Sequence, residues 1–301
     1  MGIQGKIKIE SKKVSLTFAL RPQKGKNKNG PKQPDSFTAL KDVDLEVRDG
    51  EFLVLVGPSG CGKTTFLHLV GGLETATGGS IYIDGNLVTG PGLDRGIVFQ
   101  QYALLPWKTA LGNVEFGLEV KKVPKKHWTS IARQYLHLVG LDGFEEHYPH
   151  ELSGGMRQRV AIARSLAYDP DVLLMDEPFA ALDAQTRETL QDELLRIWEE
   201  TGKTIVFITH SIDEAVYLGQ RVAVMTSKPG RIKQVIDIPL PSSRQNIDDL
   251  RSDPEYVRIR HTIWELLREE VKKAQREGIP QRFEENITKT ETVDGKLKKV
   301  V

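Results

Sequence analysis

Nine consecutive residues combine the groups needed to bind a polyphosphate. They fit the P-loop pattern G-x-x-x-x-G-K-[ST] and are Gly57, Pro58, Ser59, Gly60, Cys61, Gly62, Lys63, Thr64 and Thr65. Glycines let the backbone wrap closely around phosphate oxygens, and the exposed N–H groups face the negative charge. We expect Lys63 to place its ammonium against the β- and γ-phosphates of a nucleotide, and Thr64 to offer its hydroxyl to Mg²⁺.

The residues on either side of this loop have the patterns that a P-loop requires. The apolar run 52–56 predicts a buried parallel strand, and the apolar residues between 66 and 70 predict a short helix that ends at Gly71 or Gly72. A chain of this length matches the loop pattern by accident about once in a hundred cases. Because both flanks also fit, we interpret the loop as a nucleotide site.

Two adjacent carboxylates follow a later apolar strand. Residues 171–175 lead into Asp176 and Glu177. In open parallel sheets, ligands bind at the carboxyl ends of the strands, where the P-loop also lies. Asp176 can therefore hold the Mg²⁺ that Thr64 ligates. Neighbouring residues of an extended segment point apart, so we expect Glu177 to be free to polarise the water that attacks the γ-phosphate.

The bulk composition bounds the class of protein. Of the 301 residues, 39% are hydrophobic, which is enough for a proper core. Forty-two lysines and arginines nearly balance 41 aspartates and glutamates, so we expect no nucleic-acid partner. The apolar runs are far shorter than a bilayer span, and the first residues lack an apolar signal core. We expect a cytoplasmic protein, whose single cysteine forms no internal disulfide.

Strand and helix patterns alternate along the chain and predict an α/β fold with a largely parallel sheet. Strand patterns at 172–175, 204–208 and 222–225 alternate with amphipathic helices. Residues 6–18 alternate in hydropathy and predict edge strands. Residues 101 to about 168 predict a mostly helical insertion.

Other segments are marked by their composition or by capping residues. Residues 21–36 are rich in Lys, Asn, Gly and Pro, which predicts a flexible insertion. Ser211 and Glu214 predict a capping box at the start of a helix that Gly219 closes. Residues 241–301 predict a C-terminal helical extension with a charged tail.

One further stretch indicates a family. Residues 152–156, Leu-Ser-Gly-Gly-Met, resemble the LSGGQ signature of the ATP-binding-cassette (ABC) ATPases, with Met156 at the usual Gln position. The other motifs occur in the family's order: the P-loop, Gln100 as the Q-loop, the signature, the Asp176–Glu177 acids, Asp183 in the D-loop, and His210 as the switch histidine. The resemblance covers roughly residues 6–240. It implies an ATPase domain over 1–240 with a P-loop NTPase (RecA-like) core, an N-terminal antiparallel β subdomain and a helical signature subdomain.

The resemblance also implies what these residues do. Catalysis is expected from Lys63, Gln100, Glu177 and His210, and Mg²⁺ binding from Thr64, Gln100 and Asp176. The residues expected to contact ATP are Phe18, Gly57, Ser59, Gly60, Cys61, Gly62, Lys63, Thr64, Thr65, Ser153, Gly154, Gly155 and Asp183. Cys61 would act through its backbone. Phe18 lies where the family stacks an aromatic ring on adenine, and core packing is the other interpretation of this residue.

In this family the signature lies too far from its own P-loop to reach the same nucleotide. The resemblance therefore implies a head-to-tail pair of cassettes, with ATP between one P-loop and the partner's Ser153. Asp183 would act across the dimer, and its other interpretation is a cap for the following helix. ATP shifts such a pair toward closure, and hydrolysis lets it open.

Two stretches resemble the ATPases of nitrate, sulfonate, taurine and bicarbonate uptake. They are residues 88–96 and the Leu104–Trp107 segment after Gln100. The resemblance implies a membrane permease partner, an extracytoplasmic substrate-binding protein and a peripheral position on the cytoplasmic face of the membrane. Residues 102–107 would meet the permease, although Trp107 could instead be a core aromatic.

Two other classes of function compete with an importer ATPase. Soluble ABC proteins of DNA repair carry very long coiled coils, and those of translation usually fuse two cassettes; this sequence has neither sustained heptads nor a second cassette. A small-molecule P-loop kinase would leave residues 152–159 and His210 without a purpose. An importer ATPase accounts for all of these motifs.

Overall fold

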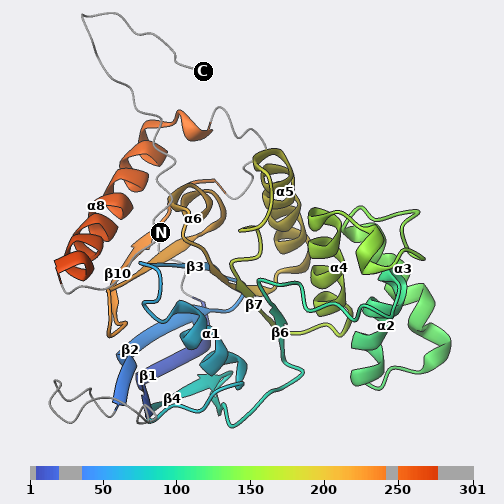
Figure 1. Cartoon of the computed structure of the whole chain (residues 1–301), viewed down its shortest axis with the longest axis horizontal. Helices are drawn as coiled ribbons and strands as arrows, with labels where there is room; N and C mark the ends of the chain where they lie inside the picture. Colours follow the sequence, from blue (N-terminus) through green and yellow to red (C-terminus); the bar gives the residue numbers. More distant parts are fainter. Residues whose placement is uncertain (1–4, 20–35, 242–249, 277–301) are drawn as a thin grey trace, which may run out of the picture.

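The computed structural model describes residues 5–19, 36–241 and 250–276. Two β-sheets lie with helix α1 between them, and the other helices pack against the second sheet or extend to one side of it (Figure 1). The predicted insertion at 21–36 lies outside the described residues except for Ser36, which already belongs to a strand.

The first sheet is antiparallel and has the strand order β2-β1-β4-β5. Its strands are β1 Ile7–Ala19, β2 Ser36–Arg48, β4 Gly78–Ile83 and β5 Asn86–Leu87. β1 pairs with β2 along one side and with β4 along the other. The prediction of edge strands over 6–18 is therefore wrong. Alternating hydropathy indicates which face of a strand is buried, but it does not indicate whether the strand pairs with other strands on one side or on both.

The second sheet is parallel except at one edge and has the order β10-β9-β3-β8-β7-β6. Its strands are β3 Phe52–Val56, β6 Arg95–Val98, β7 Val172–Asp176, β8 Thr204–Ile208, β9 Arg221–Met225 and β10 Ile232–Asp237. Only β10 runs antiparallel to its neighbour. Together the two sheets and their helices confirm the predicted α/β P-loop NTPase fold.

The central strand β3 shows why the parallel strands read as continuous apolar runs. All five of its residues are buried. Phe52, Val54 and Val56 face one hydrophobic core, whereas Leu53 and Leu55 face the other. Successive side chains of a strand point to opposite faces, so a strand covered on both faces needs an apolar residue at every position.

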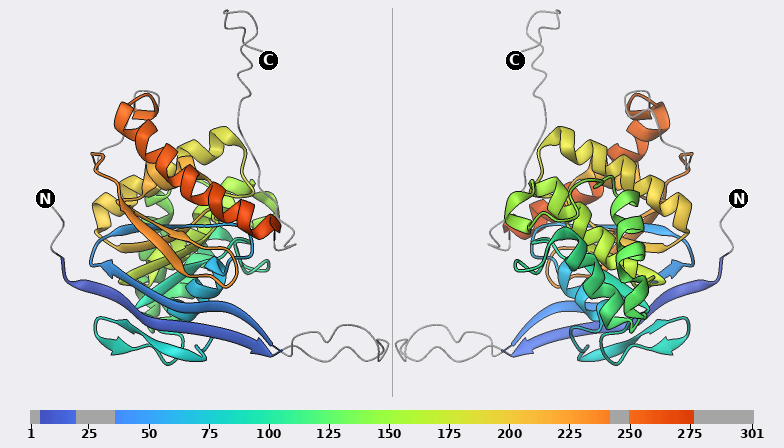
Figure 2. Two further views of the ribbon diagram at one scale, coloured as in Figure 1. Left: turned by 90° about the vertical axis from the view of Figure 1, so that its left-hand side faces the viewer. Right: turned by 90° about the vertical axis from the view of Figure 1, so that its right-hand side faces the viewer.

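The helices divide into three groups. α1 packs between the two sheets, and three helices with two 3₁₀ turns form a helical region beside β6 and β7 (Figure 1). The remaining helices cover the outer face of the second sheet, and α8 crosses it obliquely (Figure 2). Their bounds are α1 Lys63–Gly71, α2 Ala110–Val120, η1 Lys125–His127, α3 Trp128–Leu138, η2 Pro149–Glu151, α4 Gly154–Ala167, α5 Ala184–Thr201, α6 Ile212–Leu218 and α8 Pro254–Arg276. No helix within the described ranges has the length and apolar character needed to cross a bilayer.

Helix α6 forms only half of the predicted capping box. The Ser211 hydroxyl accepts a hydrogen bond from the Glu214 N–H at 3.3 Å. The Glu214 carboxylate instead accepts hydrogen bonds from the Thr209 hydroxyl and from the Gln191 amide, and it is buried. A buried carboxylate needs such donors, and this requirement prevails over the local capping pattern.

Helix α8 is part of the main hydrophobic core. Tyr256, Ile259, Ile263 and Leu267 are at most 2% exposed and belong to the same cluster as the outer face of the second sheet. They recur at three- and four-residue spacing, so one stripe of the helix faces the protein.

This packing predicts an unequal effect of two truncations in α8. Ile263→Ala should lower the free energy of unfolding by about 2–4 kcal/mol, because Ile263 is fully buried and the change leaves a cavity. Val257→Ala on the same helix is the matched control, since Val257 is 50% exposed and should cost less than about 0.5 kcal/mol. Urea unfolding measures both values. Equal losses would contradict the assignment of the buried stripe.

Candidate functional site

The P-loop joins the end of β3 to the start of α1. Gly60 and Gly62 have φ angles of 71° and 105°, a region that favours glycine. A Cβ on Gly62 would lie 2.7 Å from Cδ2 of Leu40, so a side chain would also clash there. The sequence pattern and the backbone conformation therefore agree at this loop.

The ammonium of Lys63 lies inside the loop. Its Nζ donates hydrogen bonds to the carbonyl oxygens of Gly57 at 2.9 Å and Pro58 at 3.3 Å, and the residue is only 6% exposed. The loop thus holds one buried positive charge among backbone groups, which suits a polyphosphate ligand.

A hydroxyl and a carboxylate meet beside the lysine. Thr64 Oγ1 donates to Asp176 Oδ1 at 3.0 Å, and Asp176 is 6% exposed at the end of β7. Burial raises the pKa of Asp176, and the hydrogen bond from Thr64 opposes that rise. One hydroxyl and one carboxylate fit a Mg²⁺ ion, which in nucleotide sites takes few protein oxygens and completes its shell with phosphate and water.

The next carboxylate points to a different partner. Glu177 Oε2 lies 3.3 Å from Nδ1 of His210, which follows β8. The hydrogen bond with His210 lowers the pKa of Glu177, and the same bond raises the pKa of His210. Glu177 has a φ of 45°, so the expectation of an extended segment through this residue is wrong. The Glu177 N–H donates to the carbonyl of Ile208, which is the last bond of the pairing between β7 and β8, and the positive φ of Glu177 then turns the chain away from the strand.

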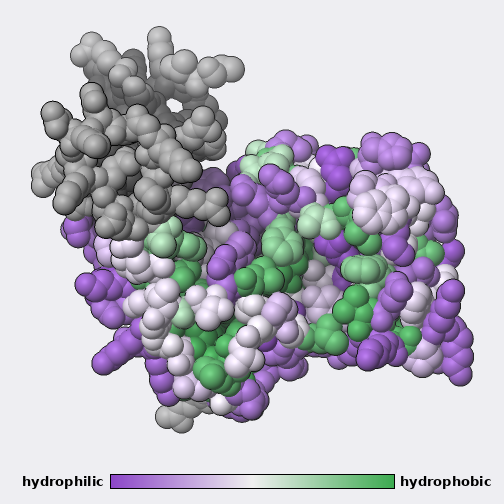
Figure 3. All heavy atoms as spheres, turned by 60° about the horizontal axis from the view of Figure 1, so that its bottom comes forward, coloured by the Kyte–Doolittle hydropathy of each residue, from purple (hydrophilic) through white to green (hydrophobic). Residues whose placement is uncertain are grey.

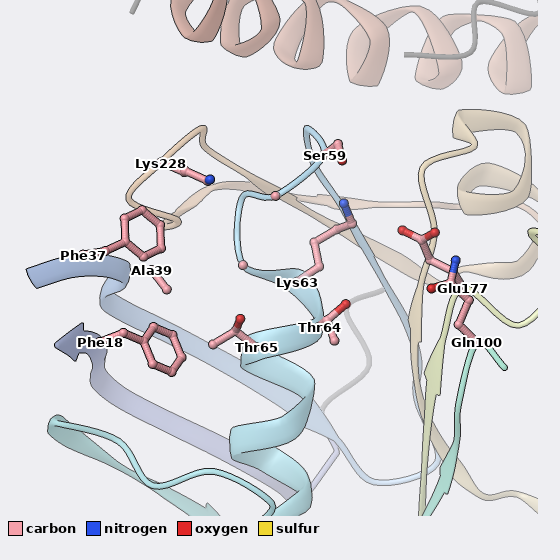
Figure 4. A pocket seen from close by; sticks show the side chains of 12 residues that line it. Phe18, Phe37, Ala39, Ser59, Lys63, Thr64, Thr65, Gln100, Glu177 and Lys228 are labelled. Carbon is pink, nitrogen blue, oxygen red and sulfur yellow. The ribbon is translucent and has the colours of Figure 1, made fainter. Parts of the chain in front are cut away.

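A pocket of about 380 Å³ brings many of the predicted residues together (Figure 4). Its lining consists of Phe18, Phe37, Ala39, Ser59, Gly60, Gly62, Lys63, Thr64, Thr65, Gln100, Glu177 and Lys228. The rings of Phe18 and Phe37 lie at one end, Gln100 and Glu177 at the other, and Lys63 between them. Gly57, Cys61, Asp176 and His210 are not part of this lining, but Asp176 contacts Thr64 and His210 contacts Glu177.

Cys61 turns its side chain away from the pocket. It is 1% exposed and packs in the core between the first sheet and α1. Burial raises the pKa of its thiol. Only the backbone of Cys61 is therefore available to a ligand in the loop.

Three residues of the pocket were not predicted from the sequence. Phe37 of β2 is the cross-strand partner of Phe18 in β1, so two aromatic rings stand at the same end of the pocket. Lys228 comes from the loop after β9, and its Nζ lies 5.0 Å from the centre of the Phe37 ring. Ala39 is the third. Strand pairing could have indicated Phe37, because the partner of an aromatic residue on the same face shares its surroundings. Phe18 is 38% exposed at the pocket, so simple core packing does not describe it.

The signature residues and Asp183 lie outside the pocket lining. The exposed Ser153 caps α4 by accepting a hydrogen bond from the Met156 N–H at 3.2 Å, and Gly154 and Gly155 open that helix. Asp183, also exposed, caps α5 through the Thr186 N–H at 2.9 Å.

A direct link joins the segment after Gln100 to the helix that Ser153 caps. Arg164 of α4 donates to the carbonyls of Ala103 at 2.7 Å and Tyr102 at 3.2 Å. Both acceptor residues have positive φ angles of 47° and 58°, which the arginine holds in place. Four residues further on, Trp107 is 71% exposed, so the alternative of a core aromatic is wrong.

Comparison with known proteins agrees with this geometry. The sequence pattern of the ABC transporter family matches residues 40–180. An uncharacterized ABC transporter ATP-binding protein of Methanocaldococcus jannaschii is 55% identical over 236 residues, which is 78% of this chain and 86% of that protein. The chain belongs to the ABC transporter family. A nitrate import ATP-binding protein of Synechocystis is 49% identical over 237 residues, and a taurine import ATP-binding protein of Pelagibacter ubique 47% over 235. Each alignment covers 77% of this chain and 89% of the relative.

Solved ABC structures share the fold. A dimeric ATP-binding cassette in a post-hydrolysis state, bound to ADP and phosphate, aligns with a TM-score of 0.65 and 34% identity. The alignment covers 77% of this chain and all of that cassette. Family membership and fold therefore support ATP binding and hydrolysis as the activity of this chain.

The Glu177–His210 pair predicts a pH-dependent contribution to stability. The raised pKa of His210 stabilises the fold most below the ordinary value of 6.5, and this is lost as pH rises through the raised value. The lowered pKa of Glu177 stabilises the fold above pH 4.5, and this stabilisation is lost as the pH falls through the lowered value. His210→Ala should therefore lower the free energy of unfolding most between pH 4.5 and 6.5. The cost there should be up to about 1 kcal/mol for this half-exposed pair, and near zero at pH 9.

Urea unfolding at pH 5.5 and pH 9 measures this difference. The control is His127→Ala, since His127 is exposed and makes no ion pair within the described ranges. A loss for His210→Ala that does not change with pH would contradict the ion pair.

Proposed function

We propose that this chain is the ATP-hydrolysing subunit of an ABC importer that takes up a small anion of the nitrate, sulfonate, taurine or bicarbonate class. The observation that supports this most directly is the pocket lined by Lys63, Thr64 and Glu177, with Asp176 bonded to Thr64 beside it, at the carboxyl ends of the parallel strands β3 and β7. Relatives named for nitrate and taurine import favour uptake over DNA repair or translation. The cargo need not touch this chain, so the anion class rests on the nitrate and taurine relatives and on the resemblance of residues 88–96 and 104–107.

We assign one role to each residue of the pocket. Lys63 and the P-loop amides would bind the β- and γ-phosphates, and Thr64, Asp176 and Gln100 would hold Mg²⁺. The ion would offset charge on the phosphates. Glu177 would accept the proton of the attacking water. Its hydrogen bond with His210 lowers its pKa, which keeps it ionised at neutral pH.

The aromatic end of the pocket would receive the base of the nucleotide. Phe18 offers a partly exposed ring there, and an aromatic face suits stacking on adenine. Gly57 and Cys61 would contribute backbone geometry alone, since the Cys61 side chain is buried in the core.

We propose that two copies, or two related cassettes, pair head to tail. Ser153, Gly154 and Gly155 open α4 outside the pocket of their own chain, so their backbone amides and the helix N-terminus are available to a nucleotide bound by a partner. Asp183 is exposed at the start of α5 and would act across the same interface. The solved dimeric cassette bound to ADP and phosphate supports such pairing.

The assembly would include membrane permease subunits and an extracytoplasmic substrate-binding protein, with this chain peripheral on the cytoplasmic face. The exposed Trp107 after Gln100 offers an apolar contact for a permease. Hydrophobic side chains also gather among hydrophilic ones on the face shown in Figure 3. Within the chain, residues 1–240 would form the ATPase domain, with its helical subdomain at about 101–168, and residues 241–301 its extension.

Replacing the proposed base should separate binding from hydrolysis. Glu177→Gln keeps the size of the side chain but cannot accept a proton, so ATP hydrolysis should fall by at least a hundredfold while ATP binding persists. Because ATP favours closure, this variant should elute as a dimer in gel filtration with ATP and as a monomer without it. A variant that remains monomeric and hydrolyses ATP at the normal rate would refute this role.

Two defective variants should restore activity when mixed. Lys63→Ala removes charge stabilisation of the transferring phosphoryl group and should abolish hydrolysis. Ser153→Asp retains a good helix cap but adds a negative charge opposite the phosphates, so it should also be inactive yet fold normally. A mixed dimer contains one intact composite site, and ATPase assays of the mixture should recover part of the wild-type rate. No recovery at any mixing ratio would contradict sharing of the site.

A further inference from the structure

The loop after β9 brings a second lysine to the pocket. Lys228 lines it beside Phe37 and Gly60, with its Nζ 5.0 Å from the centre of the Phe37 ring. A Cβ built on Gly60 would lie 3.4 Å from Cε and 3.5 Å from Nζ of Lys228. The ammonium therefore reaches the backbone of the P-loop from the side opposite Glu177 (Figure 4).

This ammonium has no carboxylate partner within the described ranges of the chain. The other charges of the pocket are engaged, since Lys63 donates to loop carbonyls and Glu177 pairs with His210. Lys228 thus adds positive charge at the mouth of a pocket that already contains a phosphate-binding loop. An anionic ligand would satisfy it.

A buried carboxylate of α8 holds the loop that carries this lysine. Glu270 Oε2 accepts hydrogen bonds from the Ser227 N–H at 2.9 Å and from its hydroxyl at 3.2 Å, and Glu270 Oε1 lies 3.0 Å from Nζ of Lys233. Glu270 is 6% exposed and Ser227 is 4% exposed. Burial opposes ionisation of Glu270, but the Ser227 N–H and the Lys233 ammonium outweigh it and hold its pKa below the usual value.

The loop is also closed on itself. The Thr226 N–H donates to the Arg231 carbonyl at 2.9 Å, and the Thr226 hydroxyl donates to the Pro229 carbonyl at 3.1 Å. These bonds give the loop a defined shape. Its position is fixed at two places: Gly230 exchanges backbone hydrogen bonds with Ala39 and Lys41 of β2, at 2.8 and 3.0 Å, and Ser227, directly before the lysine, bonds to Glu270. A positioned loop loses less conformational entropy when its lysine meets a ligand.

We propose that Lys228 is a further phosphate-binding residue of the nucleotide pocket and that Glu270 of α8 positions it. The ligand is a nucleoside di- or triphosphate, so the inference rests on the function proposed above. It makes the C-terminal helix, which lies beyond the residues that the family pattern matches, part of the nucleotide site.

Affinity for nucleotide tests the role of the lysine. Lys228→Met removes the charge and keeps an apolar stem over Phe37, so the Kd for a fluorescent ADP analogue should rise about five- to tenfold. The KM for ATP should rise by a similar factor with kcat within about twofold, because the contact is made equally in the ground and transition states. Lys228→Arg should retain the wild-type Kd. An unchanged Kd for Lys228→Met would overturn the proposal.

A matched pair of glutamates tests the positioning role. Glu270→Met keeps the volume but offers no acceptor to Ser227, and it should raise the Kd about threefold or more. Glu269→Met is the control, since Glu269 also pairs with Lys233, at 2.7 Å, but its side chain is 71% exposed and makes no hydrogen bond or ion pair with residues 226–231. Its Kd should not change. Equal effects of the two substitutions would show a general electrostatic origin and overturn the positioning role.

Combining the substitutions distinguishes positioning from loss of structure. If Glu270 acts through Lys228, adding Glu270→Met to Lys228→Met should not raise the Kd further. Additive losses would contradict the proposal. Should Glu270→Met fail to fold in a thermal melt, Ser227→Ala removes one of the two hydrogen bonds and should raise the Kd about twofold.

The Lys63→Ala variant separates this inference from the proposed function. If Lys63→Ala binds the analogue as well as wild type does, the pocket is not the nucleotide site and both proposals fail. If Lys63→Ala loses binding while Lys228→Met does not, the nucleotide site stands and only the role of Lys228 fails.

Discussion

The hydrogen bond between the Thr64 hydroxyl and the buried Asp176 carboxylate is the contact on which the rest of the site depends. It joins the first turn of α1 to the last residue of β7, although 112 positions separate the two residues in the chain. β7 is paired on both sides, with β6 and with β8, so Asp176 cannot move without the sheet. The P-loop is thereby fixed against the strand ends that carry the other polar groups. A carboxylate removed from water in this way is stabilised by a nearby cation, which is what a phosphate-bound metal supplies.

Much of the fold could be predicted from the sequence because local patterns and tertiary packing agree. Apolar runs marked the buried parallel strands, and Gly72 ends α1 in the left-handed conformation expected of a glycine cap. The failures have physical causes. β1 was expected at an edge, but a second antiparallel partner leaves no trace in hydropathy. The Ser211–Glu214 pattern predicted a local box, whereas the Glu214 carboxylate bonds to Thr209 and Gln191 inside the core.

The site was predictable where a motif is continuous in sequence and less so where side chains from distant segments meet. The conformation of the P-loop and the role of the two adjacent carboxylates could be predicted from the spacing of the motif residues and from the rule that ligands bind at strand ends. The pairing of Phe37 with Phe18 depends on the register of two strands joined by a long segment, and Lys228 reaches the pocket from a loop that bonds to both β2 and α8. Such placements depend on long-range packing, for which a single sequence has no periodic signal.

Because Cys61 is buried, its reactivity can report local opening of the P-loop. It is the only cysteine in the chain, it sits in the middle of the P-loop, and its side chain is 1% exposed. A thiolate is the reactive form, and burial raises the pKa of this thiol. Alkylation of Cys61 therefore requires a local opening of the P-loop that exposes the thiol to solvent. The rate at which a thiol reagent labels Cys61 therefore measures how often the P-loop opens locally, and no engineered cysteine is needed.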